Sequence, residues 1–245
     1  MAERMYKKGI VKGIDITTLT HQPSLCKNCI MGKQTCRHFD GSTHLATELL
    51  EHVHIDLWGP SCVISTAGKQ YMMEAVDAFG SHTEGYFLAD KEAGTTLTGL
   101  EHYVALAEQQ TGKKVKCLYV DGGSEFCNKL WECKERGIVL EPNTAYSLES
   151  NGIVERSHFT VIEHTCVLMV ENDFPPSMWC EIAATVLYLK DFIPTACHPD
   201  TTPYESWHQM KPDISHLCPI RCTSYAKIPV EKGGSKLDPC SIKGF

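Results

Sequence analysis

The stretch Asn151-Gly152-Ile153-Val154-Glu155-Arg156 places one carboxylate at the start of a predicted helix, downstream of two aspartates that each end a predicted strand. Those aspartates are Asp56 and Asp121. Three carboxylates on three separate elements indicate a metal site, because Mg²⁺ and Mn²⁺ prefer oxygen ligands. Two such ions about 3.5–4 Å apart can activate a water or a 3′-hydroxyl and stabilise the leaving oxygen of a phosphodiester. Asp56, Asp121 and Glu155 are therefore the candidate metal-binding and catalytic residues.

The strand that carries the first aspartate is Val53-His54-Ile55-Asp56-Leu57-Trp58, and Gly59-Pro60 ends it. Its aliphatic residues alternate with the others, and this period of two sends Asp56 to the face opposite Val53 and Ile55. Residues 69–79 and 82–88 follow as two further predicted strands. Short polar turns separate the three segments, which predicts an antiparallel meander.

The second half of the chain alternates between helical and extended patterns. The predicted elements are a helix over 94–110 stopped by Gly112, a strand over 115–120, a helix over 124–136, a strand over 138–140, a polar loop over 141–152, a helix over 154–170 and another after Pro175-Pro176. Past Pro194 we expect an extended tail with little core of its own. This order predicts a mixed α/β sheet, and in open α/β sheets sites gather beyond the carboxyl ends of strands, where Asp121 is expected.

Composition limits the kinds of function that the chain can have. The 245 residues carry 23 Lys and Arg against 30 Asp and Glu, a formal net charge of −7. The overall positive field of a dedicated nucleic-acid binder is therefore missing, which counts against tight, autonomous DNA binding. No stretch has the length and apolarity of a membrane span, and the first residues contain no apolar signal region. We expect an intracellular protein, nuclear or cytoplasmic, with no membrane partner.

Cysteine spacing offers a second, weaker metal motif. The chain has 13 cysteines, and irregular spacing argues against a disulfide framework. Cys26-Lys27-Asn28-Cys29 is the one close pair, and such a knuckle supplies two of the four ligands of a structural zinc site. No usual spacing selects the other two from His21, Cys36 and His38. Incomplete Zn²⁺ binding by Cys26 and Cys29 therefore stands beside the alternative of a reduced surface turn.

Six segments in the same order closely resemble the integrase of copia-type long-terminal-repeat retrotransposons. They are Cys26-x-x-Cys29-x-x-Gly32-Lys33, His54-Ile55-Asp56-Leu57-Trp58-Gly59-Pro60, Asp121-Gly122-Gly123-Ser124-Glu125-Phe126, Asn151-Gly152-Ile153-Val154-Glu155-Arg156, Thr202-Pro203-Tyr204-Glu205-Ser206-Trp207 and Lys211-Pro212-Asp213-Ile214-Ser215-His216-Leu217. The similarity covers nearly the whole chain. An Asp…Asp…Glu spacing alone is common by chance, whereas six ordered segments are specific.

The resemblance implies a ribonuclease H-like fold, with three antiparallel strands followed by parallel strands and flanked by helices. It implies a polynucleotidyl transferase that performs 3′-end processing and strand transfer with Mg²⁺ or Mn²⁺ held by Asp56, Asp121 and Glu155. Asn151, Arg156 and Lys33 are candidates for DNA contact, although Asn151 and Arg156 could instead shape the loop and the helix start. The implied partners are element ends and target DNA, with RNA as an alternative nucleic acid and a homo-oligomer as the active form.

The same resemblance suggests three regions in an integrase that is truncated at both ends. Residues 1–45 are expected to form a truncated zinc-knuckle-like segment, 46–212 the catalytic core, and 213–245 the extended tail. Phe159, His164 and Cys166 stand where similar integrases tend to carry Arg or Lys, and each missing phosphate contact weakens DNA binding. An inactive relict that keeps the fold as a nucleic-acid or protein interaction module is therefore the competing hypothesis.

Overall fold

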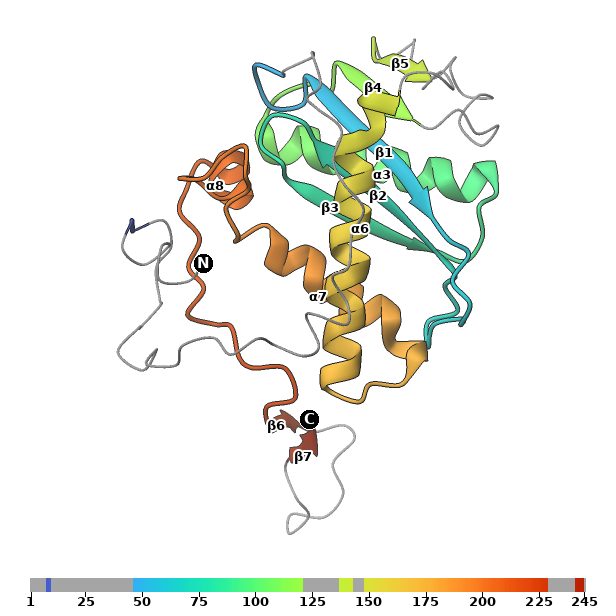
Figure 1. Cartoon of the computed structure of the whole chain (residues 1–245), viewed down its shortest axis with the longest axis vertical. Helices are drawn as coiled ribbons and strands as arrows, with labels where there is room; N and C mark the ends of the chain where they lie inside the picture. Colours follow the sequence, from blue (N-terminus) through green and yellow to red (C-terminus); the bar gives the residue numbers. More distant parts are fainter. Residues whose placement is uncertain (1–7, 10–45, 121–136, 143–147, 229–240, 245) are drawn as a thin grey trace. The chain divides into compact units, whose positions relative to one another are not determined.

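The computed structural model describes residues 8–9, 46–120, 137–142, 148–228 and 241–244, with the backbone alone for residues 142 and 148–151. The chain divides into two compact units, Met1–Ile214 and Ser215–Phe245. The first unit contains a five-stranded sheet with helices on both faces (Figure 1). In the described ranges, no helix is long and apolar enough to cross a bilayer.

The sheet is mixed, as the sequence predicts. Its spatial order is β3-β2-β1-β4-β5, in which β1 pairs antiparallel with β2, β2 antiparallel with β3, and β1 parallel with β4, which is parallel with β5. The strands are β1 (His52–Trp58), β2 (Tyr71–Asp77), β3 (Thr83–Leu88), β4 (Cys117–Val120) and β5 (Val139–Pro142). Three consecutive strands therefore form the predicted meander, and two later strands extend it in parallel beside β1.

The end of β1 requires glycine. Gly59 has a φ of +134°, and a Cβ at this position would lie 2.8 Å from the Gln70 carbonyl oxygen and overlap the ring of Tyr71. Any other residue would collide with the start of β2 and meet a backbone conformation that L side chains rarely adopt. Gly59-Pro60 thus ends the strand where the sequence predicts, directly after the segment that carries Asp56.

Helices cover the two faces of the sheet unequally (Figure 1). The α3 helix (Ala93–Thr111) lies on one face and ends at Gly112, which has the left-handed conformation expected of a helix stop. The α6 helix (Leu148–Glu171) lies on the other face, where it packs against α7 (Trp179–Lys190). A single 3₁₀ turn, η1 (Pro176–Met178), leads into α7, and the short α8 (Pro203–His208) follows.

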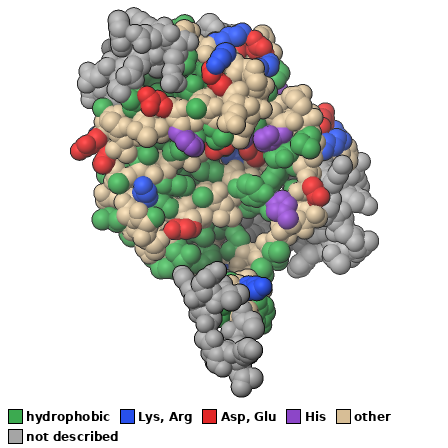
Figure 2. Space-filling model, turned by 180° about the vertical axis from the view of Figure 1, so that it is seen from behind, with side chains coloured by type: hydrophobic (Ala, Val, Ile, Leu, Met, Phe, Trp, Pro, Cys, Tyr) green, Lys and Arg blue, Asp and Glu red, His purple; other side chains and the backbone are tan. Residues whose placement is uncertain are grey.

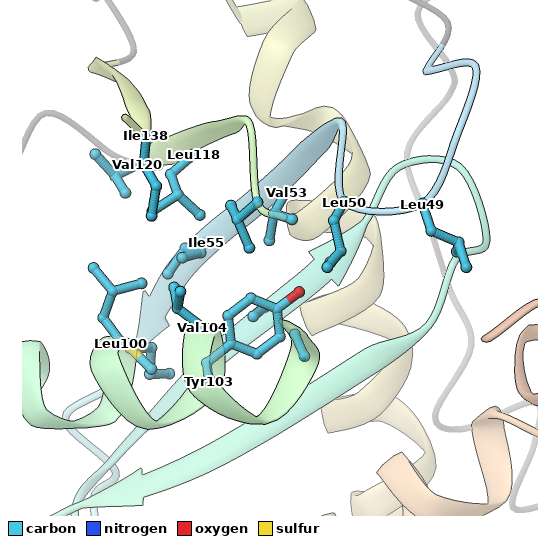
Figure 3. Close-up of a cluster of buried hydrophobic side chains, with 14 of the residues drawn as sticks. Leu49, Leu50, Val53, Ile55, Leu100, Tyr103, Val104, Leu118, Val120 and Ile138 are labelled. Carbon is cyan, nitrogen blue, oxygen red and sulfur yellow. The ribbon is translucent and has the colours of Figure 1, made fainter. Parts of the chain in front are cut away.

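Two hydrophobic cores follow from this arrangement. Figure 3 shows the first, in which Leu100, Tyr103 and Val104 of α3 pack on Val53 and Ile55 of β1. The second lies on the opposite face and joins α6 and α7 to the sheet through Met72, Val161, Trp179, Cys180, Ala183, Val186 and Leu187. Since β2 contributes to both cores, six of its seven residues are buried. The sheet is therefore covered on both faces at its centre.

Two sequence predictions need correction. The loop predicted over 141–152 is wrong at both ends, because β5 extends to Pro142 and α6 begins at Leu148. The cost of about 1 kcal/mol for Gly152 inside a helix is small enough for the packing of the rest of α6 to outweigh it.

The region after Pro194 also contains α8, which was not predicted. Thr202 caps α8 by accepting the Glu205 backbone N–H at 3.0 Å, and Trp207 is only 2% exposed.

The C-terminal unit contains a two-stranded antiparallel sheet of β6 (Ser224–Lys227) and β7 (Ser241–Gly244). All four residues of β6 are exposed, so this sheet has little apolar burial among the residues the structure describes. The predicted boundaries at 45/46 and 212/213 remain predictions. The helix predicted over 124–136 lies outside the described residues.

His82 ties the start of β3 to α7 and α8. Its ring stacks on Trp207 with centroids 4.0 Å apart, and its Nδ1 lies 2.7 Å from Oδ2 of Asp191. Its Nε2 lies 3.6 Å from Oε1 of Glu84. Burial by itself disfavours the charged ring, but the two carboxylates outweigh it and raise the pKa of His82 to about 9.

We expect the free energy of unfolding to fall as the pH rises from about 6.5 to about 9, because folded His82 keeps a proton that the unfolded chain releases. The stabilisation is fully present below pH 6.5 and is lost as the pH passes about 9. The shift corresponds to roughly 3 kcal/mol. Urea unfolding across this range measures it, and His82→Gln should flatten the dependence. Equal slopes for the two proteins would contradict this role of His82.

Gly85 lets α7 approach β3 closely, because a Cβ there would overlap the Leu187 side chain. We expect Gly85→Val to lower the free energy of unfolding by about 1–3 kcal/mol, since Leu187 must leave its packed position. Gly94→Ala is the matched control, because nothing lies within 4 Å of a Cβ at that position. Chemical denaturation compares the variants, and an equal stability of both would refute the close-packing argument.

Candidate functional site

Asp56 lies on the face of β1 opposite the aliphatic core residues, as the alternation predicts. Val53 and Ile55 are fully buried on the α3 side, whereas the half-buried Asp56 carboxylate meets α6. Its Oδ1 accepts the Leu57 backbone N–H at 2.9 Å, and its Oδ2 lies 3.1 Å from Nδ1 of His158 in hydrogen-bond geometry. Each oxygen of the carboxylate is therefore held from a different side.

The environment of Asp56 favours its ionised form. Burial opposes ionisation and is the largest single influence, but the hydrogen bond and the charge of His158 together with the Leu57 N–H outweigh it. The net result is a pKa of Asp56 below its usual value. An ionised carboxylate is the form that a hard divalent cation needs as a ligand. The surroundings of Asp56 thus fit its predicted role as a metal ligand.

The α6 helix presents a sharp contrast between its buried and exposed residues near the site. Val154, Ser157 and His158 are buried, whereas Glu155 and Arg156 are exposed. Glu155 precedes His158 by three residues, so the two lie on neighbouring positions of one helix face. Because His158 contacts Asp56, Glu155 stands one turn away along α6 from that contact, where a large substrate could reach it.

The third predicted carboxylate cannot be compared with the structure, because Asp121 lies outside the described residues. The parallel register of β1 and β4 nevertheless extends to the pair Ile55 and Val120, each of which directly precedes one of the predicted aspartates in the sequence. Among the residues that the structure describes, no group of three or more His, Cys, Asp or Glu side chains could hold a metal ion.

A buried polar network behind Asp56 was not predicted from the sequence. Glu74 of β2 is completely buried, and its Oε2 lies 3.2 Å from Nε2 of His158. Its Oε1 accepts a hydrogen bond from Ser157 and lies 3.5 Å from Nζ of Lys190. The Lys190 ammonium also donates to Ser157 and, at 2.8 Å, to Thr83 Oγ1. Burial lowers the pKa of Lys190, against the opposing influence of Glu74.

The sequence contained one signal for this network. Glu74 interrupts the otherwise apolar run Tyr71-Met72-Met73-Glu74-Ala75-Val76, and a charge inside a buried strand needs a partner. The sequence spacing does not reveal which residue is that partner or which helix carries it. The observed partners, Ser157, His158 and Lys190, come from two helices far along the chain. His158 is buried, and each of its ring nitrogens lies within 3.2 Å of a carboxylate oxygen, of Asp56 on one side and of Glu74 on the other.

The remaining predicted site residues are less informative. The sequence places Asn151 in a loop, but its backbone lies in the first turns of α6. Arg156 is exposed, and its guanidinium would meet a side chain added at Gly152. Cys26, Cys29 and Lys33 lie outside the described residues, so zinc binding and DNA contact by this segment remain predictions.

The described surface carries few concentrated positive charges on the face seen in Figure 2. Lys and Arg side chains appear there singly or in small groups, interspersed with acidic and hydrophobic side chains. This face of the described chain therefore lacks a broad basic stripe, in agreement with the formal net charge of −7 for the whole sequence. The negative formal net charge by itself reduces the long-range attraction of the whole chain to nucleic acid.

Comparisons with known sequences identify plant retrotransposon relatives, whereas no protein-family model matches the chain. It is 28% identical over 226 residues to the retrovirus-related Pol polyprotein from transposon TNT 1-94 of Nicotiana tabacum, a match covering 90% of this chain and 17% of that protein. The corresponding polyproteins from transposons RE1 and RE2 of Arabidopsis thaliana are 26% and 24% identical over 86% and 84% of the chain. The chain is homologous to retrotransposon Pol polyproteins. It spans only 14–17% of their length.

Solved structures place the fold among integrase cores. A chain in the cryo-EM structure of the simian T-cell lymphotropic virus intasome in complex with PP2A regulatory subunit B56 gamma matches with a TM-score of 0.56 and 15% identity, over 89% of this chain and 76% of that one. The HTLV-2 integrase catalytic core domain, in complex with magnesium and in a trimeric form, matches with a TM-score of 0.51 and 13% identity, over 66% of this chain and 99% of that one. The predicted ribonuclease H-like fold is confirmed.

The Glu74 network makes a prediction about stability. We expect Lys190→Met to lower the free energy of unfolding by about 3–5 kcal/mol, because it leaves the buried Glu74 carboxylate without its cation. Glu74→Gln combined with Lys190→Met should recover part of this loss. Lys113→Met is the matched control, since its ion pair with Glu48 is solvent-exposed and should change stability little. A Lys190→Met protein as stable as the control would show that the network contributes nothing.

Proposed function

We propose that this chain is the catalytic core region of a retrotransposon integrase, a polynucleotidyl transferase that processes DNA 3′ ends and joins them to target DNA. The observation that carries the proposal is the Asp56 carboxylate, ionised and half-buried on β1 beside α6 in an integrase-like fold. Homology to Pol polyproteins and the integrase fold support DNA integration as the process.

The proposed site joins Asp56, Asp121 and Glu155 around two divalent ions. When bound, Mg²⁺ or Mn²⁺ would supply activation of the attacking oxygen and charge stabilisation of the leaving oxygen. Asp56 would provide an oriented pair of oxygens, held by Leu57 and His158. Glu155, exposed on α6, would provide a third carboxylate within reach of a bound strand. The magnesium complex of the HTLV-2 integrase core supports this choice of cofactor.

The proposed partners are DNA and further copies of the chain. The intasome and the trimeric integrase core among the structural matches support both. The proposal keeps residues 46–212 as the catalytic core, residues 1–45 as a zinc-knuckle-like segment with Cys26 and Cys29, and residues 213–245 as an extended tail. Integration into chromosomal DNA would require entry into the nucleus.

A non-catalytic role is the second candidate function, and one observation favours it. Phe159 is 52% exposed on α6, one helical turn beyond Glu155 and Arg156, at a position where the resemblance suggests Arg or Lys. An exposed ring there replaces a phosphate contact by apolar surface. A relict with this surface would keep the fold and bind nucleic acid or protein weakly, without chemistry.

Cleavage and rejoining of a branched DNA oligonucleotide that mimics an integration product tests the two candidates. We expect activity in Mn²⁺ and Mg²⁺ that falls at least a hundredfold in Asp56→Asn and in Asp121→Asn, because each substitution removes a proposed metal-ligating oxygen. Glu101→Gln, an exposed carboxylate on α3, serves as the control and should retain activity. Absence of activity in folded protein would favour the inactive relict. So would an activity that is the same in Asp56→Asn, Asp121→Asn and the parent chain.

A further inference from the structure

His158 stands between two carboxylates that come from adjacent strands. Its Nδ1 lies 3.1 Å from Oδ2 of Asp56, and its Nε2 lies 3.2 Å from Oε2 of Glu74. Asp56 and Glu74 face each other directly in the antiparallel register of β1 and β2. One imidazole thus lies between a half-buried carboxylate and a completely buried one, with Nδ1 in hydrogen-bond geometry toward Asp56 and Nε2 at ion-pair distance from Glu74.

Glu74 is itself held rigidly, which makes it a fixed anchor for the ring. Its other oxygen receives the Ser157 hydroxyl and faces the Lys190 ammonium at 3.5 Å, and Lys190 also donates to Thr83. These partners come from α6, α7 and β3. The Glu74 side chain has no exposed surface, so solvent cannot replace any of these contacts. A movement of the His158 ring would therefore leave the buried Oε2 of Glu74 without its nearest polar neighbour.

We propose that His158 is a positioning residue that fixes the orientation of the Asp56 carboxylate by bridging it to the Glu74–Ser157–Lys190 anchor. With Oδ2 held by His158 and Oδ1 held by the Leu57 N–H, the carboxylate has one orientation before any ligand binds. Its relevance to a metal ion rests on the proposed function, whereas the orientation itself does not. Outer partners of this kind set ligand orientation and commonly change metal affinity by roughly 10- to 100-fold when removed.

Among the described residues, charged groups approach His158 from two strands. Asp56 approaches it from β1 and Glu74 from β2, and the Lys190 ammonium of α7 lies on the far side of Glu74 at 3.5 Å from its Oε1. Glu155 lies one turn earlier on the same helix as His158. The ring is only 8% exposed, so its position is determined by these groups and by the packing of α6. A histidine kept only for core packing would not need both nitrogens at ion-pair distance from carboxylates.

The first experiment measures the Asp56 orientation directly and needs no metal. Carbon–carbon couplings across the Asp56 χ1 angle, recorded by NMR on the labelled full chain, report whether one rotamer or several are populated. We expect one rotamer in the parent chain, several in His158→Leu, and one again in His158→Asn, whose amide can still donate to Asp56. His102→Leu is the matched control, because His102 contacts Tyr86 from α3, on the opposite face of the sheet from α6.

A second variant protects the test against a folding defect in His158→Leu. Glu74→Gln leaves the ring in place and removes the buried charge that holds its Nε2, so it should also populate further Asp56 rotamers. Retention of a single rotamer in both His158→Leu and Glu74→Gln would overturn the proposal. Loss of the single rotamer in His102→Leu would overturn it as well, because the effect would then not be specific to the bridge.

The second experiment connects the orientation to metal binding, with free Mn²⁺ followed by electron paramagnetic resonance. We expect His158→Leu to weaken Mn²⁺ binding by roughly 10- to 100-fold and His158→Asn to restore most of it. Asp56→Asn tests the ligand separately. Equal Mn²⁺ uptake by Asp56→Asn and the parent chain would refute the proposed metal site, while the rotamer result would still decide the role of His158. Normal Mn²⁺ binding by His158→Leu would count against positioning even if Asp56 is a ligand.

Discussion

A chain of buried charges holds α6 against the sheet, and the geometry of the candidate site depends on it. Glu74 and Lys190 lie between β2 and α7, and His158 carries the connection from Glu74 to Asp56. Hydrophobic contacts of Val161 and Met72 supply the non-directional part of this packing. The charged contacts set its register, because a shift of α6 by one residue would move His158 and Ser157 away from Asp56 and Glu74.

Burying such groups has a large desolvation cost that only good geometry offsets. Lys190 shows this cost in its lowered pKa, and Asp56 shows the opposite result, since its partners outweigh burial. Replacing a buried ion pair by well-packed apolar residues is often neutral or stabilising in other proteins. The network therefore makes most sense as a device for orientation. It holds one carboxylate, Asp56, at the edge of the site with its charge intact.

The net negative charge of the chain opposes long-range electrostatic attraction of DNA. The formal net charge is −7, and Phe159 exposes a ring on α6 near Glu155. If the proposed function holds, the negative net charge implies that other copies or regions help to bring DNA to the site. The chain spans only 14–17% of the polyproteins to which it is homologous, so such regions belong to longer relatives.

The sequence by itself determined the strands of the meander, the alternation that turns Asp56 away from the core, and the family resemblance, because these are properties of neighbouring residues. Only the tertiary structure decided the partners of Asp56 and Glu74, the burial of Trp207 through α8, and the helical state of residues 148–152. Those outcomes depend on groups such as His158 and Lys190 that lie far along the chain, and local spacing carries no information on contacts of that kind. Packing over long sequence distances brought them together, and burial made their charges matter.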